Sequence, residues 1–138
     1  MTYEKSCGGI IYTEDEGVRR YLIIESTEGV YGFPKGHMEE NETEMETALR
    51  EVLEETGIRP TFAEGIKLID EYPSPNKENV TRQIIYFVGK YEKQKIIIQE
   101  AEVGSAKLMT YEEAENVFQF ESLKRILREA DNFIEEKL

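Results

Sequence analysis

Three glutamates, spaced so that one helix could present them together, are the part of this sequence most able to do chemistry. Glu51, Glu54 and Glu55 lie within an arc of roughly 100° at 3.6 residues per turn. Carboxylates on neighbouring turns repel and raise each other's pKa values, so we expect a cation among them. Mg2+ suits this set because it takes oxygen ligands and combines one or two carboxylates with waters and substrate phosphates. A solvated acidic helix surface is the alternative interpretation.

The residues around these glutamates predict how the helix begins, ends and packs. Thr43, with Glu46 three residues later, forms a capping box, so the helix is expected to start at Glu44. Gly57 is expected to end it in the left-handed region. The flank expected to be buried, on the side opposite the glutamates, consists of Met45, Ala48, Leu49, Val52, Leu53 and Thr56.

The complete pattern from Gly36 to Ile58 is more specific than the glutamates alone. It reads glycine, five residues, glutamate, seven residues, then Arg-Glu-aliphatic-x-Glu-Glu-x-Gly-aliphatic. The constrained positions are Gly36, Glu42, Arg50, Glu51, Val52, Glu54, Glu55, Gly57 and Ile58. This is the signature of the Nudix hydrolase family, which the chain closely resembles. The resemblance implies an α/β fold, an α/β/α sandwich with a mixed central sheet and a loop-helix-loop catalytic motif, and hydrolysis of a nucleoside diphosphate linked to a further group.

By this resemblance, Glu51 and Glu55 are the expected metal ligands, with Glu54 a third. Mg2+ is the expected cofactor, with Mn2+ as a substitute. The family varies in which glutamate acts as general base, so that role stays open. Arg50 is included in the catalytic set because its planar fork could hold one of these carboxylates in position.

Two ligands are expected from outside the helix. A glycine at position 36 lets the backbone turn sharply, and the resemblance implies that the carbonyl of the preceding Lys35 binds the metal. A glutamate beyond the signature often completes the site in this family, and Glu102 is our candidate. Its alternative interpretation is an ordinary surface charge.

The segment before the helix bears on the substrate. Residues 33–37, Phe-Pro-Lys-Gly-His, resemble the branch of the family that cleaves diadenosine tetraphosphate asymmetrically to ATP and AMP. Lys35 and His37 would contact the polyphosphate, although a single loop histidine is otherwise an incidental residue. Further substrate-binding candidates are Lys77 and Arg82 for phosphates, and Tyr86 and Phe120 for stacking on a base. Their alternatives are solvated charges and, for Tyr86, core packing.

Length and charge limit the kind of protein. The 138 residues predict one domain, and the formal net charge of −12 disfavours duplex nucleic acid as a partner but allows a small nucleotide. Cys7 is expected to be a small buried residue. With no signal peptide and no apolar run near the roughly 20 residues that span a membrane, we expect a cytoplasmic protein. Whether it is a monomer or a homodimer stays open.

Hydrophobic patterning supplies the remaining elements. Strands are expected at residues 3–13, 18–26, near 62–72, 80–91, 96–98 and 107–110, and helices also at 111–117 and 121–137. Strands flanked by helices predict the sandwich independently of the resemblance. Two other functions stay open: hydrolysis of another nucleotide, such as an oxidised nucleoside triphosphate, a nucleotide sugar or an RNA 5′ end, and non-catalytic nucleotide sensing.

Overall fold

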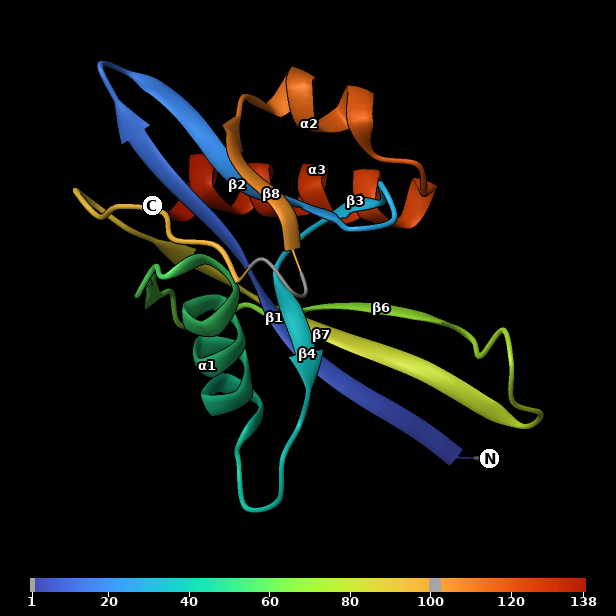
Figure 1. Ribbon diagram of the computed structural model, residues 1–138. Coiled ribbons are helices and arrows are strands. Elements are labelled where there is room, and N and C mark those ends of the chain that lie inside the picture. The colour runs from blue at the N-terminus through green and yellow to red at the C-terminus, as the bar shows by residue number, and fades with distance from the viewer. Residues whose placement is uncertain (1, 100–102) are drawn as a thin grey trace.

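A computed structural model describes residues 2–99 and 103–138, and its described strands form one eight-stranded sheet with helices on both faces (Figure 1). The strands are β1 (Thr2–Asp15), β2 (Val18–Ser26), β3 (Tyr31–Gly32), β4 (Lys35–His37), β5 (Thr61–Phe62), β6 (Leu68–Pro73), β7 (Val80–Lys90) and β8 (Val103–Met109). The helices are α1 (Glu44–Thr56), α2 (Tyr111–Val117) and α3 (Glu121–Lys137).

Strand β1 organises the sheet because it pairs with three others. It runs parallel to β7 from the pair Thr2 and Val80 onward. Along its opposite edge it pairs antiparallel first with β4, around Gly8 opposite Lys35, and farther along with β2. Strands β5 and β6 pair with β7, and β8 pairs with β2. The sheet is therefore mixed, as expected, and β4 lies directly beside the middle of β1.

Alternation along β1 separates two layers of core. Ile10 and Tyr12 pack with side chains of α2 and α3, whereas Ile11 packs with Val52 of α1. Because successive side chains of a strand point to opposite faces, α1 covers one face and the other two helices cover the other, as Figure 1 shows. The predicted α/β/α sandwich is confirmed. Cys7 is fully buried, as expected, and burial raises the pKa of its thiol to about 11.

Local signals predicted the helices well. Helix α1 starts at Glu44 after the Thr43 capping box and ends at Gly57, whose φ is 74°. Helices α2 and α3 have the expected bounds. In α3 the expected apolar stripe is buried at Leu123, Ile126, Leu127, Ala130 and Ile134, with Phe133 half-buried. No helix in the described part of the chain is long and apolar enough to cross a membrane.

Several strand predictions were wrong in detail. The strand expected near 62–72 is two strands, β5 and β6, separated by a bend that contains Gly65 at a φ of 83°. Residues 96–98 form no strand; their backbone covers the end of α1, where the Ile97 amide donates to the Thr56 carbonyl at 2.7 Å. Strand β8 begins at Val103, earlier than the expected 107. The two short strands β3 and β4 were not predicted.

Candidate active site

Arg50 of α1 binds the loop before the helix to the glutamates of the helix. Its Nε and Nη2 donate to the two carboxylate oxygens of Glu42 at 2.6 and 3.0 Å, and Nη2 also donates to the His37 carbonyl at 2.9 Å. Its Nη1 donates to Glu51 at 2.8 Å and to Glu54 at 3.3 Å. The guanidinium thus donates its hydrogen bonds to groups of the protein itself, which makes Arg50 a positioning residue.

Glu42, in the loop before α1, is the main partner of Arg50, and we call the set of Arg50, Glu42, Glu51 and Glu54 the clamp. Its carboxylate also accepts from the Thr47 hydroxyl at 2.8 Å and from the Glu39 amide at 2.9 Å. The hydrogen bond from Arg50, and next that amide, hold the pKa of Glu42 at about 2, well below its ordinary value of 4.5. Glu42, a constrained position of the signature, is therefore the carboxylate that anchors Arg50, and we interpret its role as structural.

The direction of the glutamates differs from the sequence prediction. Glu51 and Glu55 are buried, with exposed fractions of 9% and 5%, whereas only Glu54 faces solvent. The buried flank of α1 is Thr47, Ala48, Glu51, Val52, Glu55 and Thr56. Met45, which was expected on the buried flank, is 41% exposed, and Leu49 and Leu53 are only half-buried. Two carboxylates therefore lie on the side of the helix that faces the sheet.

Gly36 explains how one of these carboxylates is accommodated. A Cβ built at Gly36 would overlap the carboxylate of Glu51, so the Glu51 side chain occupies the space that any larger residue would fill. The Lys35 carbonyl belongs to the peptide bond that precedes Gly36, and its role as a metal ligand stays a prediction. The observed position of the Glu51 carboxylate between β4 and α1 thus requires glycine at position 36.

We tested whether this arrangement fits a divalent cation. Among residues 2–99 and 103–138, no three side chains of His, Cys, Asp or Glu converge closely enough to be recognised as a metal site. Mg2+ needs fewer, since it takes one or two carboxylates and completes its shell with water and phosphate. Glu51 and Glu55, one turn apart on the buried flank, are oxygen donors of the right type. The donor set fits, and the ligand assignments stay a prediction.

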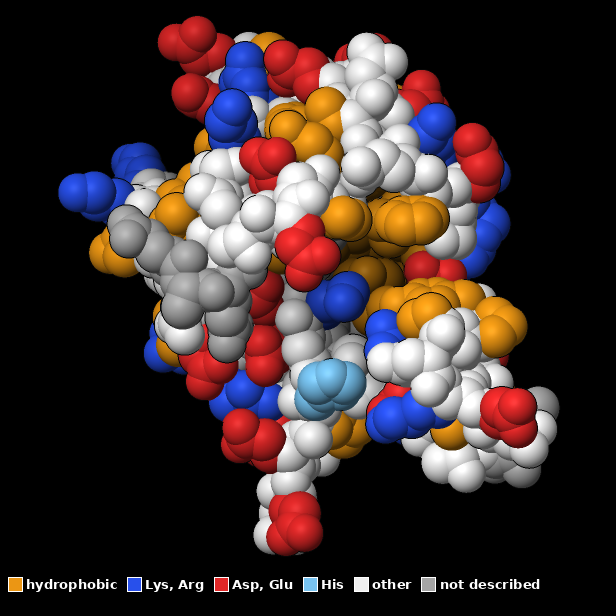
Figure 2. Space-filling model, turned by 45° about the vertical axis from the view of Figure 1, so that its right-hand side comes forward, with side chains coloured by type: hydrophobic (Ala, Val, Ile, Leu, Met, Phe, Trp, Pro, Cys, Tyr) orange, Lys and Arg blue, Asp and Glu red, His pale blue; other side chains and the backbone are white. Residues whose placement is uncertain are grey.

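A cavity of about 560 Å3 opens beside Glu55. Its lining includes Lys35 and Glu55, residues 70–72 of β6, Tyr86 of β7, and Phe120 and Ser122 at the start of α3. Figure 2 shows a hollow with hydrophobic side chains inside it, and with basic and histidine side chains beside it. The tertiary structure therefore brings together segments that are far apart in the sequence and gives the cavity an apolar and a charged part.

The predicted substrate residues fall into two groups. Lys35 is exposed and lines the cavity, His37 lies two residues farther along β4, and Phe120 is 55% exposed at the cavity. Tyr86 is different, because only 1% of it is exposed and its ring packs edge-on to Phe33 with centroids 5.5 Å apart. Burial raises the pKa of Tyr86. The expectation that Tyr86 stacks on a base is corrected, since its ring forms part of the core.

Tyr72 is the aromatic residue that sequence reasoning missed. It is 36% exposed, lies near the end of β6 and lines the same cavity as Phe120. The available signal was its place just before the Pro-Ser-Pro loop, where a strand residue can leave the core. Treating residues 62–72 as one continuous strand concealed that signal.

The two other basic candidates are already paired. Lys77 Nζ lies 2.8 Å from Glu4 Oε2, and Arg82 Nε lies 3.8 Å from Glu4 Oε1. The Lys77 hydrogen bond is the main reason that the pKa of Glu4 is lowered. Arg82 is also the direct cross-strand partner of Tyr72, so it lies next to the cavity. Glu102 lies outside the described residues, and the described chain before it reaches α1 through the Gln99 amide, 3.3 Å from the Glu55 carbonyl.

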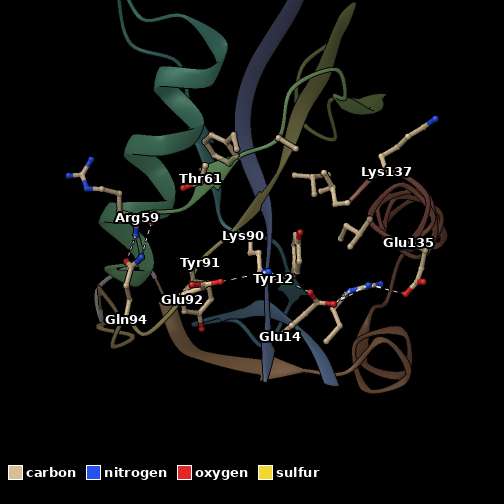
Figure 3. Close-up of a pocket in the computed structure, with 16 residues that line it drawn as sticks. Tyr12, Glu14, Arg59, Thr61, Lys90, Tyr91, Glu92, Gln94, Glu135 and Lys137 are labelled. Carbon is tan, nitrogen blue, oxygen red and sulfur yellow. Dashed lines mark hydrogen bonds and ion pairs between the residues drawn. The ribbon is translucent and has the colours of Figure 1, made fainter. Parts of the chain in front are cut away.

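A second cavity, of about 780 Å3, lies at the far ends of β1 and β7 (Figure 3). Lys90 there lies 3.6 Å from Glu14 and 3.8 Å from Glu92. Gln94 and Arg59 exchange two hydrogen bonds through the Arg59 backbone on another side of the cavity. Glu14, Glu92 and Glu135, which line this cavity, form ion pairs with Arg19 or Lys90. The signature glutamates do not line it. It is therefore not the candidate active site.

The sequence and the fold are both similar to those of known proteins. A family model described as the NUDIX domain matches residues 3–130. The chain is 29% identical to the asymmetrical bis(5′-nucleosyl)-tetraphosphatase of Mus musculus over 142 residues, which covers 94% of this chain and 95% of the relative. It is 31% identical over 119 residues to an NAD-capped RNA hydrolase of Mannheimia succiniciproducens, covering 81% and 42%. A solved structure of a C. elegans Ap4A hydrolase binary complex superposes with a TM-score of 0.88 at 22% identity, covering 96% of this chain and 98% of that one.

Proposed function

The chain belongs to the Nudix family of hydrolases, and from that premise we propose that it hydrolyses dinucleoside polyphosphates, cleaving diadenosine tetraphosphate asymmetrically to ATP and AMP. One observation carries the proposal: a single cavity is lined both by Glu55 and Lys35 and by the exposed aromatic rings of Tyr72 and Phe120. Carboxylates and a lysine suit phosphate chemistry, and exposed rings suit a base. The name of the mouse relative supports the same substrate class.

Nudix hydrolases generally require a divalent metal ion, and we propose Mg2+ here, with Mn2+ as a substitute. Bound beside the carboxylates, such an ion would activate water and offset charge on the phosphate oxygens. Glu51, Glu55 and Glu54 are the proposed ligands, with the Lys35 carbonyl and Glu102 as additional ones. Which glutamate accepts the proton from water is left open.

The chain's own residues would position the substrate around that centre. Arg50 holds Glu51 and Glu54 through the hydrogen bonds described above, which fixes their carboxylates before substrate arrives. Lys35 and His37 would contact the phosphate chain. Tyr72 and Phe120 would hold a base, and stacking of this kind is worth roughly 1 to 3 kcal/mol per base. Lys77 and Arg82 would release Glu4 and bind the distal phosphates of the substrate instead.

The same proposal covers the setting of the reaction. We propose that residues 1–138 act as one cytoplasmic domain on small nucleotides. The formal net charge of −12 would repel duplex nucleic acid over long range, whereas a metal and a few basic side chains suffice for a polyphosphate.

Product analysis tests the reaction. Purified protein is incubated with diadenosine tetraphosphate, Mg2+ and 18O-labelled water, and the products are separated and weighed by mass spectrometry. We expect ATP and AMP in equal amounts, with the label in one of them only. Two ADP molecules would refute asymmetric cleavage.

The same assay compares other nucleotides, because the relative from Mannheimia succiniciproducens acts on NAD-capped RNA by its name. Rapid cleavage of a capped RNA, an oxidised nucleoside triphosphate or a nucleotide sugar, with no turnover of diadenosine tetraphosphate, would refute the proposed substrate and keep the family chemistry. Binding without turnover of any compound would favour a nucleotide-sensing role.

A further inference from the structure

Asp70 is a buried carboxylate in the proposed nucleotide cavity that the catalytic proposal does not use. It lies on β6 with 5% of its surface exposed, and it lines the cavity together with Tyr72 and Phe120. The Ser122 hydroxyl donates to Asp70 Oδ2 at 3.2 Å. Burying a carboxylate is unfavourable unless partners compensate it, so its presence in a ligand cavity calls for a functional reason.

The position of this hydrogen bond relates it to the two aromatic rings. Asp70 precedes Tyr72 by two residues on β6, so both side chains point to the same face of the sheet. Ser122 follows Phe120 by two residues, at the start of α3. The Asp70–Ser122 hydrogen bond therefore joins the two segments that carry the rings. A base held by those rings would meet these two side chains with one of its edges.

Asp70 itself offers only acceptors to such a contact. A carboxylate accepts hydrogen bonds and donates none. The Ser122 hydroxyl donates its hydrogen bond to Asp70, so toward other partners the Ser122 oxygen can only accept. Tyr86 lies in the same cavity wall, and after burial the charge of Asp70 is the next largest cause of the raised pKa of its hydroxyl. On the neighbouring strand β7 the residue directly opposite Asp70 is Ile84, whose side chain is apolar. A complementary ligand edge would carry N–H donors.

We propose that Asp70 selects the base by accepting a hydrogen bond from the 6-amino group of adenine and by repelling a 6-oxo group in the same place. The inference deepens the proposed function and rests on it in one respect, namely that the cavity receives a nucleotide base. A site built to hydrogen-bond one group discriminates strongly against an analogue without it, because its own polar atoms are then left buried and unsatisfied. Discrimination of roughly ten- to hundredfold is expected for one such contact.

Binding of three nucleotides to the full chain tests this proposal without relying on turnover. AMP, purine riboside 5′-monophosphate and IMP carry an amino group, a hydrogen atom and an oxo group at position 6. Isothermal titration calorimetry of the wild-type protein in Mg2+ should give affinities that fall in this order, with AMP at least tenfold tighter than IMP. Equal affinities, or tighter binding of IMP, would overturn the proposal.

A matched pair of variants isolates the carboxylate. Asp70→Asn keeps the shape and can pair with either edge, so the preference for AMP over IMP should shrink to within about twofold. Asp15→Asn makes the same chemical change at the exposed last residue of β1 and should keep the wild-type preference. Circular dichroism establishes whether both variants are folded. If Asp70→Asn does not fold, the affinities of the wild-type protein for the three nucleotides decide the question by themselves. A folded Asp70→Asn with unchanged preference would overturn the proposal.

Hydrolysis measured in parallel separates the two proposals. Cleavage of diadenosine tetraphosphate to ATP and AMP without discrimination among the three nucleotides would refute base selection and keep the reaction. Discrimination that depends on Asp70 without cleavage would refute the reaction and keep base selection. If none of the three nucleotides binds, the base site itself is refuted.

Discussion

Replacing Gly36 by alanine tests whether the contact between β4 and α1 sets the position of Glu51. The added methyl group would occupy the same space as the Glu51 carboxylate, which lies closer to that point than side chains tolerate. The carboxylate would have to move by about 1 Å, and displacing a catalytic group by that distance can reduce a rate about a hundredfold. We therefore expect kcat of Gly36→Ala to fall by about two orders of magnitude.

The effect on stability should be smaller than the effect on rate. The Glu51 carboxylate is the end of a flexible side chain and can rotate away. The loss of folding free energy should therefore lie within the range of about 1 to 3 kcal/mol for overpacking. KM should change little, because Lys35, Tyr72 and Phe120 are untouched. Thermal melting followed by circular dichroism, together with steady-state kinetics on diadenosine tetraphosphate, separates these quantities.

Gly32→Ala is the matched control. A Cβ there would meet only the Leu123 Cδ1 atom, at 3.9 Å, which is an ordinary van der Waals contact. Because Gly32 lines the substrate cavity, this variant is the control for stability, and it should keep a melting temperature close to that of the wild type. If Gly36→Ala were folded and kept the wild-type kcat, Glu51 would not need the position that Gly36 provides, and the reasoning would be refuted.

Three further predictions concern Arg50, Glu55 and Glu42. Arg50→Lys should lower the melting temperature and reduce kcat at least tenfold, since one ammonium cannot bridge Glu42, Glu51 and the His37 carbonyl; unchanged kinetics would argue against a positioning role. Glu55→Gln should reduce the rate by orders of magnitude in a folded protein, and turnover equal to wild type would move the chemistry elsewhere. The lowered pKa of Glu42 means that its contribution to stability is complete above about pH 4.5 and is lost as the pH falls through about 2; melting temperatures across this window should depend less on pH in Glu42→Gln, and identical profiles would contradict the assignment.

Features that depend on neighbouring residues were readable in the sequence. The bounds of α1 follow from a capping box and a terminal glycine, both of which act within one turn of the helix. The signature from Gly36 to Ile58 indicated the family for the same reason, because its constrained positions lie on one helix and the segments directly before and after it. The pairing of Arg50 with a carboxylate was also within reach, since Glu54 is one turn away.

Features that depend on distant segments were not readable. Glu4 forms ion pairs with Lys77 and Arg82 because the parallel pairing of β1 with β7 sets Glu4 opposite Arg82. The apolar run 96–98 has the composition of a strand, yet it packs over the end of α1, where the Thr56 carbonyl accepts its hydrogen bond. A local pattern cannot distinguish these outcomes, because each partner lies many residues away.

The sequence by itself determined the family, the helices and the identity of the acidic residues, because these are encoded in short-range spacing. The tertiary structure alone decided that Glu51 and Glu55 are buried against the sheet. For Glu51 the reason is the absence of a side chain at Gly36, which leaves room for its carboxylate beside β4. It also decided that Tyr72 is exposed at the cavity, whereas Tyr86 is buried in the core behind it. Strand alternation gives a side chain's face, but which part of that face is covered depends on where α3 crosses the sheet.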